Sequence, residues 1–407
     1  MGWPSAQLER ATSFFTDTQR DFIKKISPQH ALNLVRRYSC AASLLVWAAP
    51  FAFAQTTTPI GSAAANAAVA PEIRIADQRG IEVKLAAPAQ RIVAIPVPMA
   101  SIVMALDGSS RRVVGMHPVA KTSIEEGLLK KIYPQSLGIA SDITRGGMFN
   151  PNMETVLALR PDVVVAWSEP LEAVQTMERA GLTVLTLRND PPNLQAHFGN
   201  LDKLAKALGL QARLAAMRSD MEAKQAQAQR AVAGLNAASA TRAMYLQQAK
   251  TAMRASGNNT FQDYWINQSG AKNVAGALSG HQPQTSLEQI IAWDPEIIFL
   301  GTFDTALPAE IYANPSLANV AAVRNKRVYK LPHGGYRWDP ASQESGLMLL
   351  WAAAVTHPAV PNLNLRNEMR RTYEAIYRYA LTDGEMDDIL QIRANSGSAG
   401  YSAKFSR

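Results

Sequence analysis

The chain has 407 residues and a formal net charge of +8 at pH 7. Its Lys and Arg residues form no basic block, which argues against nucleic-acid binding, and its single cysteine excludes a disulfide framework. A chain of this length exceeds one comfortable hydrophobic core, so we expect two domains.

The first 54 residues are typical of an export signal. Arg36 and Arg37 precede an apolar stretch at residues 40–53, which ends in Ala-Phe-Ala before Gln55. This stretch is too short to span a bilayer as a helix. We therefore expect cleavage between Ala54 and Gln55, a periplasmic location and no stable membrane anchor.

Within this signal, residues 35–54 are the functional part. Residues 1–34 are long for a signal peptide and carry the acidic residues Glu9, Asp17 and Asp21, so we expect translation to start near Val35. The paired arginines leave general secretion and twin-arginine export both open. Cleavage removes six basic and three acidic residues, so the net charge of +8 falls to +5, and the only cysteine is lost.

Short apolar strands alternate with helices over the next part of the chain. Residues 55–71 are rich in Thr, Ala and Ser without periodicity, which predicts a disordered leader. A hairpin is expected at 72–85. The strands expected after it lie at 91–95, 113–116, 163–167 and 183–187. The helices expected between them begin near Ser101 and cover 151–159 and 171–180. This alternation predicts βαβ units with a parallel sheet.

Two long helical stretches, 194–208 and 211–235, interrupt the alternation and predict a rigid bridge. Beyond them the pattern resumes. Strands are expected at 242–247, 297–300 and 328–330, and helices at 260–269, 287–293, 309–313, 343–356 and 364–379. The Ser/Gly-rich end, from Ala394, predicts a frayed terminus.

These elements give the following organisation. The expected segments are a signal peptide at 1–54, a leader at 55–71, an N-terminal α/β lobe at 72–195, connecting helices at 196–237, a C-terminal α/β lobe at 238–362, a C-terminal helix at 363–390 and a flexible tail at 391–407. The elements predict an α/β fold class, with two lobes of mainly parallel sheet joined by one long helix.

One unit of sequence occurs twice. Residues 153–167 and 287–301 both read as a short helix, a proline break and an apolar strand, at a constant offset of 134 residues. The offset places Glu154 on Glu288 and Pro161 on Pro295. A repeat at this spacing is too distant for a solenoid and predicts two lobes of one design.

The chain resembles the periplasmic solute-binding proteins of ABC importers for iron chelates and cobalamin. The resemblance rests on RIVAIPVPMASIVMAL at 91–106, on the doubled unit, on RVYKLPHGGYRWD at 327–339 and on the long helix. It implies two Rossmann-like lobes joined by one long rigid helix, with a ligand cleft between the lobes. It also implies that Glu154 and Glu288, one in each lobe, dock on the permease dimer, although first-turn acids also suit the helix dipole. A monomer is expected.

Open α/β sheets bind ligands at the carboxyl ends of their strands. The loops expected there are 96–100, 144–150, 167–170, 189–190, 248–259, 280–284, 301–304 and 333–339. The side chains selected from these loops as ligand contacts are Met99, Arg145, Phe149, Trp167, Arg254, Gln282, Phe303, Tyr336, Arg337 and Trp338. Two aromatic rings beside Arg337 suit a bulky, partly anionic metal chelate.

No resident cofactor or metal is expected, because the histidines form no cluster with ligand spacing. His281 and His333 fall on cleft loops as polar lining residues, and either could ligate haem iron. The leading hypothesis is a receptor for a ferric siderophore. Haem, cobalamin and molybdate remain alternatives. A secreted enzyme lacks support, because the sequence has no GxGxxG, GxSxG or HExxH motif.

Overall fold

The computed structural model describes residues 72–145, 149–235, 240–359 and 363–406, which belong to one compact unit. The expected signal peptide and leader lie outside the described residues. None of the described helices is long and apolar enough to cross a membrane.

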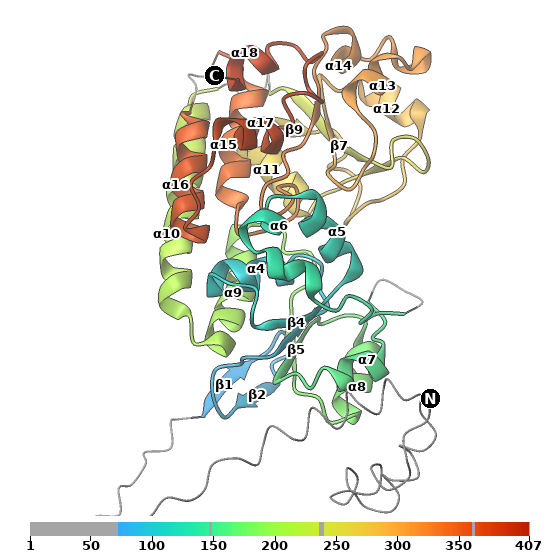
Figure 1. The fold of residues 1–407 in the computed structure, drawn as a ribbon. Coiled ribbons are helices and arrows are strands. Elements are labelled where there is room, and N and C mark those ends of the chain that lie inside the picture. Colours follow the sequence, from blue (N-terminus) through green and yellow to red (C-terminus); the bar gives the residue numbers. More distant parts are fainter. Residues whose placement is uncertain (1–71, 146–148, 236–239, 360–362, 407) are drawn as a thin grey trace, which may run out of the picture. The chain divides into compact units, whose positions relative to one another are not determined.

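The N-terminal lobe is built on a four-stranded parallel sheet in the order β4-β3-β5-β6 (Figure 1). Its strands are β3 (Ile92–Ala94), β4 (Val113–Met116), β5 (Val163–Trp167) and β6 (Val184–Leu187). A hairpin of β1 (Ile73–Ala76) and β2 (Glu82–Leu85) precedes it. Its helices are α4 (Met99–Asp107), α5 (Pro118–Glu126), α6 (Leu129–Ile132), α7 (Met153–Ala158) and α8 (Leu171–Arg179). Every residue of β5 is buried, as a strand covered on both faces requires.

The C-terminal lobe has a similar plan, but its sheet is only mainly parallel, because its edge strand β8 pairs antiparallel with β7. Its sheet has the order β11-β10-β7-β8, and β9 also pairs with β7. The strands are β7 (Arg242–Gln247), β8 (Arg254–Ala255), β9 (Lys272–Asn273), β10 (Ile297–Leu300) and β11 (Val328–Lys330). The helices are α11 (Phe261–Gln268), α12 (Leu287–Trp293), α13 (Pro308–Tyr312) and α14 (Ala321–Arg324). The doubled sequence unit therefore forms α7–β5 in one lobe and α12–β10 in the other.

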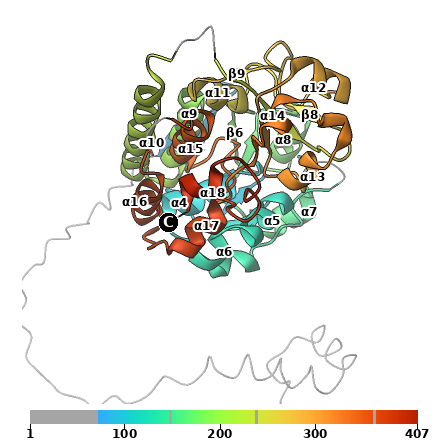
Figure 2. The ribbon, with the colours of Figure 1, turned by 90° about the horizontal axis from the view of Figure 1, so that it is seen from above.

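Long helices join the lobes. After α9 (Leu194–Leu208), α10 (Gln211–Val232) packs along α15 (Ser345–Thr356) and α16 (Leu365–Tyr377) (Figure 2). Arg213 on α10 donates to Ala105 O of the first lobe and to Ile376 O of α16, both at 3.0 Å. Buried Lys224 pairs with Glu368 of α16 at 3.4 Å. The expected fold, two α/β lobes joined by a long helix, is confirmed.

The C-terminal end differs from the expectation. Residues 363–390 form two helices, α16 and α17 (Asp383–Ile389), instead of one. The segment expected as a flexible tail ends in α18 (Tyr401–Phe405), whose two aromatic residues are buried. Asn395 bonds the backbone N and O of Lys330 on β11 at 2.7 and 2.9 Å. The polar composition of this segment gives little sign of the packing. Only Tyr401 and Phe405, four residues apart on one helix face, are buried in α18.

We predict that Tyr401→Ala lowers the free energy of unfolding by about 3–5 kcal/mol, as truncation of a buried aromatic does. Tyr401 receives a hydrogen bond from Trp351 Nε1 at 2.9 Å and donates to Leu390 O at 2.6 Å. Urea unfolding followed by circular dichroism measures the change. Ala403→Ser, at an exposed position of the same helix, is the control. Equal stability of both variants would mean that the tail is not packed.

Candidate functional site

A cavity of about 440 Å³ is lined by residues of both lobes. Its walls include Val97 after β3, Trp167 at the end of β5 and Asn189 after β6. From the other lobe come Gln248 after β7 and Phe303 after β10. These positions are the carboxyl ends of the parallel strands, where α/β sheets bind ligands. The volume lies in the range of small-molecule sites.

The lining combines aromatic rings with amides and has almost no formal charge. Its aromatic members are Phe149, Trp167, Tyr245, Phe261, Phe303 and Tyr336. Its amides are Asn189, Gln247, Gln248, Gln262 and Gln282. Asp190 is the one carboxylate among the lining residues that the structure describes, and these include no Lys or Arg. The site therefore offers π-faces and neutral hydrogen-bonding groups.

Six of the ten side chains selected from the sequence line this cavity. They are Met99, Phe149, Trp167, Gln282, Phe303 and Tyr336. Their contact with a ligand stays a prediction. The other four, which include all three arginines, lie elsewhere.

Two of these arginines, Arg145 and Arg254, lie outside the lining. Arg145 is largely exposed and approaches Glu154, with Nη2 3.5 Å from Oε2. Arg254 donates from Nη1 to Gln282 O at 2.9 Å and from Nε to Gln248 Oε1 at 3.2 Å. Arg254 thus holds the backbone of one lining residue and the side chain of another, without lining the cavity itself.

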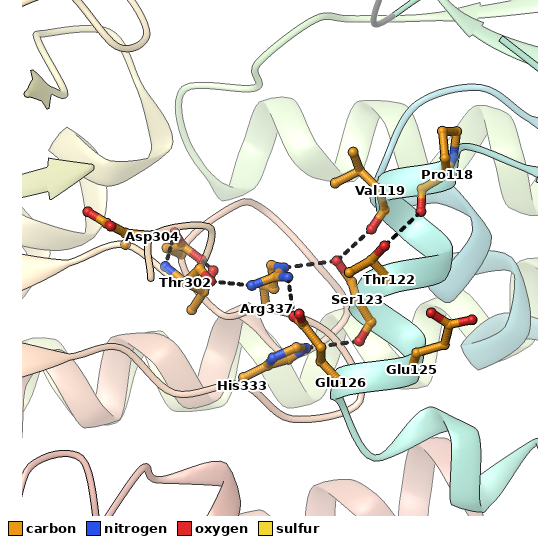
Figure 3. Close-up of polar contacts among 12 residues, drawn as sticks. Pro118, Val119, Thr122, Ser123, Glu125, Glu126, Thr302, Asp304, His333 and Arg337 are labelled. Atoms are coloured by element: carbon orange, nitrogen blue, oxygen red, sulfur yellow. Dashed lines mark hydrogen bonds and ion pairs between the residues drawn. The ribbon is translucent and has the colours of Figure 1, made fainter. Parts of the chain in front are cut away.

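Arg337 is buried between the lobes (Figure 3). On the N-terminal side its guanidinium donates to Ser123 Oγ at 2.8 Å and pairs with Glu126 Oε2 at 2.6 Å, both on α5. On the C-terminal side it donates to Thr302 O, and it lies 4.4 Å from the ring centroid of Phe303. Its charge is thus satisfied within the protein.

His333 belongs to the same contact between α5 and the 333–337 loop (Figure 3). Burial lowers its pKa to about 3, so its ring is neutral at neutral pH. Nε2 lies 3.1 Å from Ser123 O, and because a carbonyl only accepts, Nε2 carries the hydrogen. Leu128 N also donates to Gly334 O at 2.9 Å. His333, expected as a lining residue, therefore holds the lobes together instead.

Trp338 is fully buried and does not line the cavity. Its Nε1 donates to Glu344 Oε2 at 2.6 Å, inside a cluster completed by Tyr373 and Tyr377. Burial raises the pKa of Glu344, and four hydrogen bonds act against this shift. The aromatic side chain expected over a ligand is therefore part of the core beneath the 333–337 loop.

Two buried polar side chains of the lining lack partners. Both His197 ring nitrogens and the Tyr336 hydroxyl have no hydrogen-bond partner among the described residues. Both residues line the cavity. Burial lowers the pKa of His197 to about 4, so its ring is neutral at neutral pH. An unmatched buried polar group is costly, so both are available to a ligand.

The sequence reasoning missed several lining residues. His197 lies in the first turn of α9, which was assigned only to the connection. Tyr245 and Gln247 lie within β7, and Phe261 and Gln262 begin α11. Gln247 is the last residue of β7, and this position at a strand end indicates a cavity-lining residue. The two α11 residues lie inside a helix and not on a loop at a strand end, so their positions give no such signal.

Glu154 and Glu288 lie in the first turns of α7 and α12, exposed in both lobes. The Ser286 side chain caps α12 by accepting from Gln289 N at 3.2 Å. A hydrogen bond from its own backbone amide and one from Ser286 lower the pKa of Glu288. No group of three or more His, Cys, Asp or Glu side chains that could hold a metal ion occurs among the described residues.

Two substitutions of tyrosine by phenylalanine test whether the Tyr336 hydroxyl lacks a hydrogen-bond partner. We predict that Tyr336→Phe leaves the free energy of unfolding unchanged or raises it by about 1 kcal/mol, because an unpaired buried hydroxyl is removed. The control is Tyr373→Phe. This hydroxyl donates to Glu344 Oε2 at 3.0 Å and accepts from Gly335 N at 2.8 Å, so its loss should cost about 1–3 kcal/mol. Urea unfolding without ligand measures both, and an equal loss would show that Tyr336 has a partner in the free protein.

Comparisons with known proteins agree with this geometry. A family model described as "Periplasmic binding protein" matches residues 100–333, more than half of the chain. A periplasmic solute-binding protein of Veillonella parvula superposes with a TM-score of 0.70 at 32% identity, covering 80% of this chain and 99% of that one.

Two further relatives have stated ligands. The molybdate-binding protein MolA of Haemophilus influenzae is 23% identical over 57% of this chain and 72% of its own length. A periplasmic heme-binding protein of Pseudomonas aeruginosa superposes with a TM-score of 0.53 at 26% identity, covering 67% of this chain and 94% of that one. The chain therefore belongs to the periplasmic binding protein family, a family of solute-binding proteins and not of enzymes.

Proposed function

We propose that this protein captures a metal chelate without net negative charge, with a ferric hydroxamate siderophore as the leading candidate. The observation that supports the proposal is the lining: six aromatic side chains, five amides, one carboxylate and no described cation. A ferric ion held only by hydroxamate groups forms a neutral complex. Its apolar backbone suits the rings, and its peripheral amides suit the Gln and Asn side chains.

The expectation of an anionic chelate rested on Arg337 and its neighbouring rings. Arg337 lies between the lobes, with three protein partners, and Trp338 lies in the core. A catecholate complex would bring several negative charges into a site without a matching cation, and an unpaired charge that loses water is costly. The lining therefore favours neutral or cationic chelates over anionic ones.

Haem is the second candidate. His281 lines the cavity and could ligate iron, and the Pseudomonas aeruginosa relative is a heme-binding protein. The propionates of haem would have to remain in water, as the described lining offers them no cation.

Molybdate and cobalamin fit less well. Molybdate, the ligand of the Haemophilus influenzae relative, is a small dianion that would leave most of this aromatic cavity unfilled. A whole corrinoid with its nucleotide loop would need the lobes further apart.

The remaining parts of the proposal concern export and delivery. Cleavage between Ala54 and Gln55 would release a monomer into the periplasm. Glu154 and Glu288 would then dock the loaded protein on the permease dimer of its importer. Exposed carboxylates in equivalent positions of two lobes suit a partner with two equivalent basic sites.

Tryptophan fluorescence of the purified protein tests the ligand class. We predict saturable quenching by a neutral or cationic ferric hydroxamate, with an affinity at least about tenfold higher than for a ferric catecholate. Haem, cyanocobalamin and molybdate complete the panel. Trp167→Phe identifies the part of the signal that comes from the cavity. Tighter binding of the anionic catecholate would contradict the proposal.

A further inference from the structure

The two halves of the repeat match in exposure as well as in sequence. In α7 the core contacts are Met153, Val156 and Leu159. In α12, at the same offset of 134 residues, they are Leu287, Ile290 and Trp293. These three apolar positions attach each helix to its lobe.

Each helix nevertheless has another large apolar side chain that faces water. Leu157 is 43% exposed and Ile291 is 44% exposed, and they occupy the same position of the repeat. Neither is among the side chains packed against a core cluster. The fold does not require an apolar residue at these positions.

Each exposed apolar residue lies one turn after a docking glutamate. Leu157 follows Glu154 by three residues, and Ile291 follows Glu288 by three, so each pair shares one helix face. Ala158 and Ala292 are exposed beside them. The same surface, a carboxylate next to an aliphatic side chain, is thus present once in each lobe.

Two exposed apolar residues occupy equivalent places in the repeats. The described residues include seven exposed large hydrophobic side chains, and two of them, Leu157 and Ile291, have the same position in the two repeats. Leu171 begins α8 after β5, and Leu307 is the residue before α13 after β10, but the offset of 134 residues does not relate these two positions. Figure 1 shows α7 beside α8 and α12 beside α13. Single exposed apolar residues are ordinary, but their repetition at equivalent places is not.

We propose that Leu157 and Ile291 are apolar anchors that bind the membrane subunits of the importer, each in an apolar recess beside a basic side chain. The inference rests on the proposed function, because it takes the permease dimer as the partner. The carboxylates select a basic partner surface and steer the approach, and the aliphatic side chains lose water on contact. Since both lobes present the same pair, the partner has this recess twice, as a two-fold dimer does.

Photo-crosslinking in cells that carry the gene tests the inference without knowledge of the ligand. A benzophenone amino acid replaces Ala158 or Ala292, next to each anchor, in the otherwise native chain. We expect both positions to crosslink to the same multi-spanning membrane subunit. Leu157→Ser with Ile291→Ser should lower the crosslink yield by about tenfold. Ile81→Ser, at a 50% exposed position outside the repeats, should leave the yield unchanged.

The outcomes separate this inference from the proposed function. If Glu154→Ala with Glu288→Ala abolishes the crosslink and the double serine variant does not, the anchors are refuted and the docking glutamates stand. If neither position of the native protein captures a membrane subunit, both the anchors and the docking surface are wrong. Thermal melting of the double serine variant should match the native protein, because neither side chain packs on a core.

Discussion

The buried guanidinium of Arg337 is the interaction that joins the two lobes and on which the arrangement of the cavity walls depends. A buried charge needs partners, and Arg337 obtains them from Ser123 and Glu126 of one lobe and from Thr302 of the other. The contact also includes the neutral His333 and the backbone of Leu128. Separation of the lobes along this contact would leave the arginine unpaired or hydrated, so the contact favours the arrangement of the lobes described here.

The same interaction determines the chemistry of the cavity. Arg337 is engaged between the lobes, and Arg254 binds the backbone of Gln282. The lining therefore offers aromatic rings and amides and lacks the positive charge of these two arginines. The unpartnered Tyr336 hydroxyl and His197 imidazole add neutral polar groups at the wall. A site of this kind distinguishes ligands by shape, by hydrogen bonding and by the absence of negative charge.

The fold was predictable because its signals are local: apolar strands, proline breaks and the doubled unit that became α7–β5 and α12–β10. The site was predictable only to the level of loops: Trp167 and Tyr336 lie on loops expected at the cleft, and both line the cavity. Three consecutive residues have different surroundings: Tyr336 lines the cavity, Arg337 joins the lobes and Trp338 lies in the core. The direction of a side chain on such a loop depends on its tertiary partners, which are α5 for Arg337 and Glu344 for Trp338. No local sequence pattern reveals these partners.

Iron anomalous diffraction from crystals grown with a ferric hydroxamate tests the central claim most directly. The account predicts one strong iron peak inside the cavity, among Trp167, Phe303 and Tyr336, with the Arg337–Glu126 contact intact. Iron bound outside this cavity, or an arginine turned from α5 to meet the ligand, would contradict it.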